Sequence, residues 1–406
     1  MNFYADKSDD LPRLLYRRAR RELVERPDGN AVRSAVINLC NELTMFKGDY
    51  RKLRFYLPSF LVEVLTDDER ELVDGVLSKM RTKLENRLSN VYPHCSDEFS
   101  LATPFLMDVL CESPVGGISK SHKSFTIGSC FARNIAEHLN AKGYNFSVLG
   151  QTEDLNSPFS NAELLELCTT QPLVRRTLIA KWLDTFSPQE AQQNQTQAEN
   201  MSEAIETIKH TIAHVDIIVL TLGNNLDFFG DVPNQIKEIS SDREYSYEIA
   251  PKVLGFVDTE DVGRRATFAK QLTKRGFQLR AGTFTETKSA VLTLLRRLRQ
   301  LNSHCKFYIT LSPVPIDSAI GLNSDQMQGA VKLDCQSKSQ LRCIIDELQN
   351  EGVADFVYFP SFEVVRWLAP MVSAPIFGQE DAASRHVSSQ ILESVFNLFE
   401  ACHCDG

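Results

Sequence analysis

The run FTIGSCFA, residues 125 to 132, joins a short apolar strand to an amphipathic helix. Its first three residues favour a strand. The helix is predicted over residues 131 to 140, where Phe131, Ile135 and Leu139 recur every four positions on one face. Gly143 follows, as glycine often does just past the end of a helix. The stretch is therefore the start of alternating strands and helices.

The alternation continues outward from this run. Further strands are predicted at residues 146–149, 216–222, 306–311 and 355–359. Helices are predicted around residues 204–212, 284–301, 337–348 and 387–399. Such alternation favours right-handed βαβ units, and so a three-layer α/β/α sandwich with about five parallel strands over residues 118–400. Ligands of such sheets bind outside the carboxyl ends of the strands.

Two segments depart from this pattern. Residues 1–112 carry apolar side chains at helical spacing and are predicted to form an all-helical N-terminal domain, which ends before the glycine-containing stretch 113–117. Residues 227–282 are polar, charged and weakly periodic. We interpret them as an insertion that serves as a lid or shapes the substrate site.

Composition sets the broad class of the protein. A chain of 406 residues with 43% hydrophobic and 24% charged residues is typical of a soluble globular protein of two domains. A net charge of −9 argues against nucleic-acid binding, which needs a basic face. No apolar run is long enough to span a membrane, and the N-terminus lacks signal-peptide features, so a cytoplasmic location with reduced cysteines is expected.

Distinctive residues follow several predicted strands and precede the last helix. They are Gly128-Ser129-Cys130, Gly223-Asn224-Asn225, Ser312-Pro313-Val314-Pro315, Tyr358-Phe359-Pro360-Ser361, and Asp381 with His386. Taken in this order over residues 120 to 400, these blocks resemble the bacterial GSCFA family. That family looks like a relative of the SGNH or GDSL hydrolases, which place a nucleophile after the first strand and a C-terminal Asp and His beside it.

The resemblance leaves two candidate nucleophiles. Aligned with the Gly-Asp-Ser-Leu pattern, Gly128-Ser129-Cys130-Phe131 puts Cys130 at the serine position. A thiol at a helix N-terminus is a sound nucleophile, because the helix dipole favours the thiolate. Ser129 is the alternative, either as nucleophile or as a helix cap. Packing of Cys130 as a small buried thiol is the structural alternative.

The remaining triad members are expected near the closing helix. The resemblance implies that His386 is the base and that Asp381 orients it. Asp381 lies five residues before His386, whereas the superfamily spacing is three, and position 383 is alanine. A solvated loop acid is the alternative role for Asp381.

An oxyanion site is expected after the strand at 216–222. Gly223 and Asn225 match a Gly-x-Asn pattern whose amide stabilises the oxyanion, together with Gly128 and the backbone amides at 129–131. A simple turn explains the same residues equally well. For the second oxyanion donor, Gly150 and Asn156 are both candidates.

These features imply an enzyme that hydrolyses O-acyl esters, of a carbohydrate or surface polysaccharide, through a covalent acyl-enzyme. An O-acyltransferase acting on a polysaccharide precursor, or a non-catalytic carbohydrate-binding or assembly protein of the same fold, are the alternatives. No cofactor or metal is expected. His210 and His214 lack an accompanying acidic motif, and Cys402-His403-Cys404 is expected in a frayed tail without a second ligand pair.

Overall fold

The computed structural model describes residues 117–149, 155–186, 188–230, 272–274, 276–316, 329–352, 355–369, 376–378 and 386–405. A five-stranded parallel sheet forms the core of this part of the chain. The strands lie in the order β2-β1-β3-β6-β7. Their bounds are β1 (Lys123–Gly128), β2 (Asn145–Val148), β3 (Ile217–Leu222), β6 (Lys306–Leu311) and β7 (Phe356–Phe359). The chain passes from β1 outward to β2, and then returns to the other side of β1. The order of strands therefore reverses between β1 and β3.

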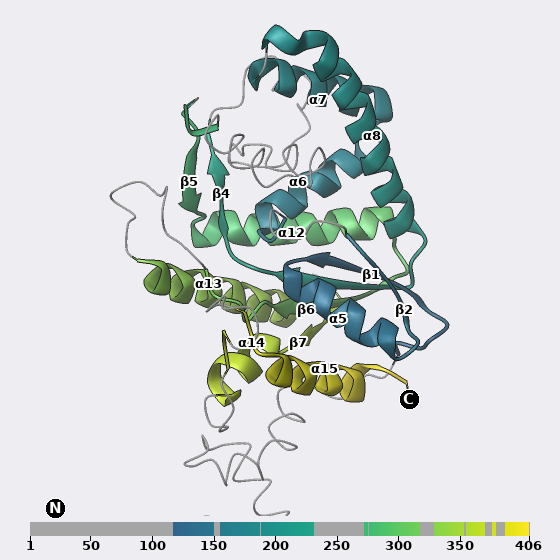
Figure 1. The fold of residues 1–406 in the computed structure, drawn as a ribbon, viewed down its shortest axis with the longest axis vertical. Coiled ribbons are helices and arrows are strands. Elements are labelled where there is room, and N and C mark those ends of the chain that lie inside the picture. Colours follow the sequence, from purple (N-terminus) through teal and green to yellow (C-terminus); the bar gives the residue numbers. More distant parts are fainter. Residues whose placement is uncertain are drawn as a thin grey trace, which may run out of the picture. The chain divides into compact units, whose positions relative to one another are not determined.

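Helices cover both faces of the sheet (Figure 1). One face carries α5 (Cys130–Ala141) and α15 (Ser389–His403). The other face carries α6 (Pro158–Thr169), α8 (Ala191–Ala213), α12 (Phe284–Leu301) and α13 (Ala330–Asn350), and α7 (Pro172–Phe186) packs along α8. This arrangement confirms the predicted three-layer α/β/α architecture.

The two faces of the sheet have different chemistry. Towards α12 and α13, β3 presents Ile218, Leu220 and Leu222, which belong to the main apolar core. Towards α5 and α15, hydroxyl groups are frequent, among them Thr126 and Thr221, which are fully buried. Alternation along each strand assigns successive side chains to opposite faces, so these hydroxyls form a polar layer beneath α5 and α15.

Two of the predicted segments lie wholly or mostly outside the described residues, and one prediction about the C-terminus was wrong. Residues 1–112 lie outside the described residues, so the helical N-terminal domain stays a prediction. Of the insertion at 227–282, only its two ends and residues 272–274 are described: β4 (Leu226–Phe229) and β5 (Gln278–Ala281) pair as an antiparallel ribbon. The closing helix runs to His403, and the backbone of Cys404 forms an isolated parallel β-bridge with Ile118. The expectation of a frayed tail was therefore wrong.

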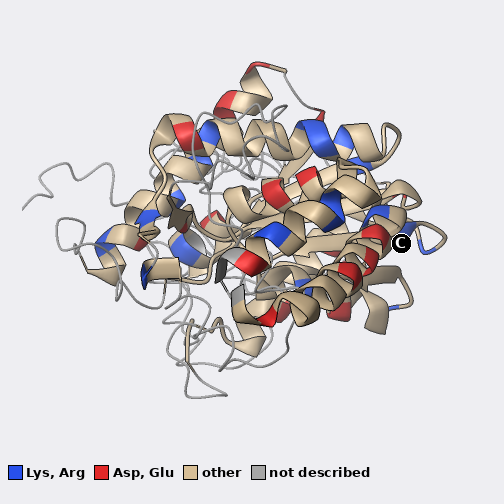
Figure 2. Cartoon of the chain, turned by 90° about the horizontal axis from the view of Figure 1, so that it is seen from above, with Lys and Arg blue, Asp and Glu red and all other residues tan. Residues whose placement is uncertain are grey.

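Charged residues of both signs are interspersed over the described helices (Figure 2). Some of them join helices that are distant in sequence. Arg297 of α12 pairs with Glu166 of α6 at 2.7 Å, and Lys288 of α12 pairs with Glu347 of α13 at 3.0 Å. Such partly exposed pairs contribute little stability individually, so the buried apolar core is the main source of stability.

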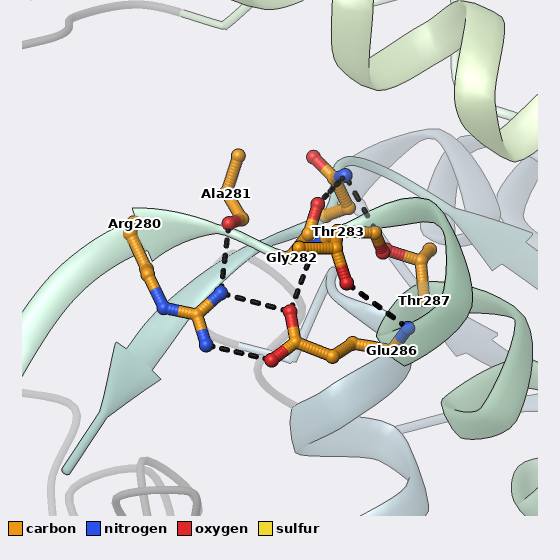
Figure 3. A network of polar contacts seen from close by, with 7 residues as sticks. Arg280, Ala281, Gly282, Thr283, Glu286 and Thr287 are labelled. Atoms are coloured by element: carbon orange, nitrogen blue, oxygen red, sulfur yellow. Dashed lines mark hydrogen bonds and ion pairs between the residues drawn. The ribbon is translucent and has the colours of Figure 1, made fainter. Parts of the chain in front are cut away.

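The junction between β5 and α12 is held by a polar network (Figure 3). Thr283 caps α12 in a capping box with Glu286, and Arg280 holds the same carboxylate through two contacts of 2.8 and 2.9 Å. The hydrogen bond from Arg280 lowers the pKa of Glu286 to about 2, and bonds from Thr283 add to the effect. The network fixes the base of the ribbon to the start of a core helix.

Replacing Glu286 with glutamine is expected to lower the free energy of unfolding by about 1–2 kcal/mol at pH 7. Because the folded-state pKa lies below the unfolded one, this stabilisation is complete above about pH 4.5 and is lost as the pH falls towards 2. Urea unfolding at pH 7 and pH 3 measures the difference, which should shrink to less than half at pH 3. Glu347→Gln, in an exposed pair, is the matched control. An equal deficit at both pH values would contradict the prediction.

Candidate active site

The carboxyl ends of β1 and β3 define the topological switch point of the sheet. Ser129 and Cys130 follow β1, and Gly223 to Asn225 follow β3. Gly128 pairs with Thr221 in the ladder, so these two segments leave the sheet side by side. In open parallel sheets this crevice is where ligands bind. The sequence motifs therefore converge at the position that the topology favours for a site.

Ser129 and Cys130 differ in their accessibility at the start of α5. Ser129 is 5% exposed and occupies the N-cap position, but its side chain makes no capping hydrogen bond. Its Oγ has no hydrogen-bond partner among the described residues. Cys130, the first residue of α5, is partly exposed and is not in a disulfide. Of the two, the thiol is the better placed to meet a ligand, at a helix N-terminus that favours its thiolate form.

Lys338 is the main feature of this edge that the motifs did not identify. Its side chain, only 1% exposed, reaches from α13 and donates through Nζ to the backbone carbonyls of Gly223 and of Ser312, the latter at 2.7 Å. These carbonyls follow β3 and β6 respectively. A signal was present in the sequence: Lys338 lies on the same helical stripe as Leu341 and Ile345, where an apolar residue is expected.

Burial is the chief influence on the Lys338 ammonium. It lowers the pKa of Lys338 to about 7, and the nearby Arg366 acts in the same direction. Asp334, one turn earlier on α13, and a thiolate at Cys130 oppose this shift. Asp334 also accepts a hydrogen bond from the Ile316 amide at 2.9 Å and pairs with Arg366 of the helical turn η5 (Val364–Leu368). Charges on α13 itself, on η5 and on α5 thus act on one buried amine.

Two asparagines lie beside the switch point. The carbonyl of Asn156 accepts hydrogen bonds from the amides of Gly223 at 2.7 Å and Asn224 at 3.2 Å. The side chain of Asn224 donates to Oδ1 of Asn156 at 3.1 Å and accepts from the amide of Leu226. A Cβ on Gly223 would lie 2.8 Å from Cβ of Asn156, so this close approach requires glycine. Asn156 and Asn224 are both partly exposed, and Gly150 lies outside the described residues.

Asn225, the residue that the motif indicated, is fully buried. Its side-chain amide is buried and donates to the carbonyl of Gly282 at 3.1 Å and to Oε1 of Gln340 at 2.8 Å. Its backbone amide donates to Oγ of Ser337 at 2.9 Å. These bonds occupy both amide protons of the side chain, which argues against its expected role as an oxyanion donor. The same contacts tie the end of β3 to α13 and to the polar network of Figure 3.

His386 is on the same side of the molecule as Cys130. The last residues of α15 lie at the amino ends of the strands, where the backbone carbonyl of His403 accepts a hydrogen bond from the amide of Ile118. The helix α15 runs in the same direction as α5, because Phe131 contacts Phe396 at 5.3 Å and Lys142 pairs with Glu400, so its N-terminal side lies towards the carboxyl ends of the strands. His386 is two residues before the N-cap Ser388 and is partly buried. Its backbone carbonyl accepts a hydrogen bond from the amide of Gly378. Asp381 lies outside the described residues.

Comparison with known families covers this part of the chain. The family model described as the GSCFA family matches residues 123–399, about two thirds of the chain. The chain belongs to the GSCFA family. Every motif at the switch point and at the start of α15 falls within the matched range. No curated protein matches the chain significantly.

The described part of this GSCFA protein offers no obvious metal site. In it, no three His, Cys, Asp or Glu side chains gather closely enough to hold a metal ion. His210 and His214 stack on α8 with their rings 4.1 Å apart, on a helix of the outer layer. Nor is any helix in the described ranges both long and apolar enough to cross a membrane.

Proposed function

We propose that this GSCFA protein transfers the acyl group of an O-ester through a covalent thioester on Cys130, in the simplest case to water. The observation that carries the proposal is the position of Cys130: an accessible thiol at the first residue of α5, at the switch point between β1 and β3. A ligand in this crevice would meet the thiol directly. Acyl transfer needs a nucleophile, a proton donor and oxyanion donors, and we assign these roles to Cys130, His386 and the groups named below.

The proposed reaction has two steps. In the first, the thiolate of Cys130 attacks the acyl carbon, the C–S bond forms, and the C–O bond breaks as protonated His386 gives its proton to the departing alcohol. In the second, His386 takes the proton of water or of an acceptor hydroxyl, whose oxygen displaces the thiolate. Asp381 is proposed to orient His386. This assignment of roles extends the resemblance to SGNH-type hydrolases noted in the sequence.

Oxyanion stabilisation is proposed to come from Asn156 and Asn224 with backbone amides at the start of α5, in place of Asn225. Both asparagines are partly exposed at the same edge as Cys130, whereas the amide of Asn225 is fully engaged elsewhere. The carboxamide of Asn224 uses one of its two protons on Asn156, so a second is available for a ligand oxygen.

The buried hydroxyl of Ser129 favours Cys130 as the nucleophile. A serine requires a base within hydrogen-bond reach of Oγ, and among the described residues Oγ of Ser129 has no partner. The family resemblance points to a carbohydrate O-ester as substrate. Hydrolysis and transfer to a sugar hydroxyl use the same steps and differ only in which acceptor the crevice admits.

The proposal predicts that Cys130→Ala abolishes release of p-nitrophenol from p-nitrophenyl acetate, lowering kcat/KM by at least about a thousandfold. His386→Ala is expected to lower kcat strongly, and Ser129→Ala to leave most activity. Intact-mass measurement after brief mixing should show an acyl adduct on wild type that is absent from Cys130→Ala.

Cys343→Ala, which removes an exposed thiol of α13, is the matched control and should behave as wild type. Each variant is compared with wild type by circular dichroism and thermal melting. Full activity in Cys130→Ala would overturn the assignment of the nucleophile. Neither turnover nor an acyl adduct with acetylated sugars and p-nitrophenyl esters would overturn acyl transfer and favour a carbohydrate-binding role.

A further inference from the structure

A fully buried lysine beside an accessible cysteine calls for an explanation that packing alone does not supply. Lysine is among the residues least often buried completely, because removing its charge from water is costly. Lys338 nevertheless occupies a position on the apolar stripe of α13 where a leucine would fit the pattern. Its Nζ donates to the carbonyl of Gly223 just past β3, and Cys130 lies two residues past the end of the neighbouring strand β1.

The two carbonyls that hold Nζ determine which protonation states are tolerated. An ammonium has three protons to donate, whereas a neutral amine has two protons and one lone pair. The carbonyls of Gly223 and Ser312 accept two hydrogen bonds in either state. In both protonation states two N–H groups of Lys338 therefore donate to these carbonyls. The remaining site on the nitrogen is a third N–H donor in the ammonium and an accepting lone pair in the neutral amine. This is the arrangement that a proton carrier needs.

The charged groups around Nζ come from every element packed at this point. Asp334 on α13 is negative, Arg366 on η5 is positive and is paired with Asp334, and Cys130 on α5 is negative when ionised. The ion pair of Asp334 and Arg366 largely cancels at a distance. A thiolate at Cys130, past the end of the neighbouring strand, then adds to the groups that favour the ammonium of Lys338.

We propose that Lys338 accepts the thiol proton of Cys130, so that the resting protein holds a thiolate–ammonium pair. In this step the S–H bond breaks and an N–H bond forms, with no net change of charge. Lys338 acts through Cys130 and is a positioning residue rather than a catalytic one. The inference rests on the proposed function only in taking Cys130 as the nucleophile. His386 keeps its proposed role towards the leaving group and the acceptor.

The test measures the rate at which iodoacetamide alkylates each cysteine, as a function of pH, by peptide mass spectrometry. Thiolates react and thiols do not, so each rate profile follows ionisation. Cys343, exposed on α13, provides the reference within the same sample. In wild type, alkylation of Cys130 is expected to reach half its maximum at least about one pH unit below that of Cys343.

Two variants separate proton acceptance from a structural role. Lys338→Met should move the profile of Cys130 upward, slowing alkylation at pH 7 about tenfold, and leave Cys343 unchanged. Lys338→Arg keeps a fixed cation and should retain the low profile of Cys130. Lys338→Gln, neutral and still able to donate to a carbonyl, replaces the methionine variant if that does not fold.

Either of two results would overturn the inference: Cys130 and Cys343 ionising together in wild type, or an unshifted profile in a folded Lys338→Met or Lys338→Gln. The second result would make Lys338 a structural tie between the ends of β3 and β6. These outcomes are independent of ester turnover. A low Cys130 profile without any acyl adduct would refute the proposed function while supporting the ion pair.

Discussion

Replacing Gly128 with alanine is expected to lower the free energy of unfolding by about 4 kcal/mol, a large part of the 5–15 kcal/mol typical of a domain. Gly128 is the last residue of β1 and has a φ of +119°, a backbone conformation that residues other than glycine rarely adopt. A Cβ at this position would lie 2.0 Å from the carbonyl oxygen of Thr221 and 2.9 Å from its carbonyl carbon. Both obstacles are backbone atoms of the adjacent strand, so they cannot rotate away.

The alanine variant must therefore push β1 away from β3 at the switch point. Thermal melting should show the loss as a fall of roughly 10 °C or more in Tm. Gly352→Ala is the matched control, because Gly352 also has positive φ, +61°, yet nothing lies within 4 Å of its Cβ position. It should lose only about 1 kcal/mol from backbone strain. Similar losses in the two variants would show that the close approach to Thr221 is unimportant.

Acid is expected to destabilise the protein by about 3 kcal/mol between pH 6.5 and pH 4 through His403 alone. His403 is completely buried in an aromatic cluster with Tyr308, Phe359 and Phe399. Among the described residues neither ring nitrogen has a hydrogen-bond partner. Burial lowers the pKa of His403 to about 4, and the neighbouring Lys306 acts in the same direction.

The sign of the effect follows from these values. The unfolded chain takes up a proton on this histidine near pH 6.5, whereas the folded protein resists it until about pH 4. Stability is therefore complete above pH 6.5 and falls as the pH is lowered through that window. His403→Phe, which keeps an aromatic ring and removes two unpaired nitrogens, should remove this contribution and raise stability at neutral pH by about 1–2 kcal/mol.

Urea unfolding of wild type and His403→Phe between pH 4 and pH 8 provides the measurement, read as the difference between their free energies. The difference should widen by roughly 3 kcal/mol towards pH 4. His210→Gln, on the stacked pair of α8, is the control and should leave the pH dependence as in wild type. A constant difference across the range would mean that His403 keeps its proton equilibrium on folding.

Much of the fold was predictable because its signals are local. The strand at β3 is apolar at every position, as burial on both faces requires, and the helix α12 was predicted with the bounds observed. The helix α13 was predicted to begin at Ser337, seven residues after its actual start at Ala330. Residues 330 to 336 have no cap signal and a single buried apolar side chain, Leu333, so only the packing of the first turns reveals them.

The candidate site was only partly predictable. The motif placed Ser129 and Cys130 correctly after the first strand, but could not distinguish a buried hydroxyl from an accessible thiol. Asn225 matched the oxyanion pattern, yet its amide bonds to Gly282 and Gln340, residues 57 and 115 positions away. A pattern of neighbouring residues carries no information on which of two adjacent asparagines turns towards the crevice.

The sequence by itself determined the alternation of strands and helices and the family. The alternation depends on residues within a few positions of one another, since side-chain period is a local property, and the family depends on motifs read in order along the chain. Only the tertiary structure decided that Lys338 meets the ends of β3 and β6 beside Cys130. These segments are brought together by the strand order and by the burial of α13, and the free energy of ionising a buried group depends on all the charges and dipoles around it.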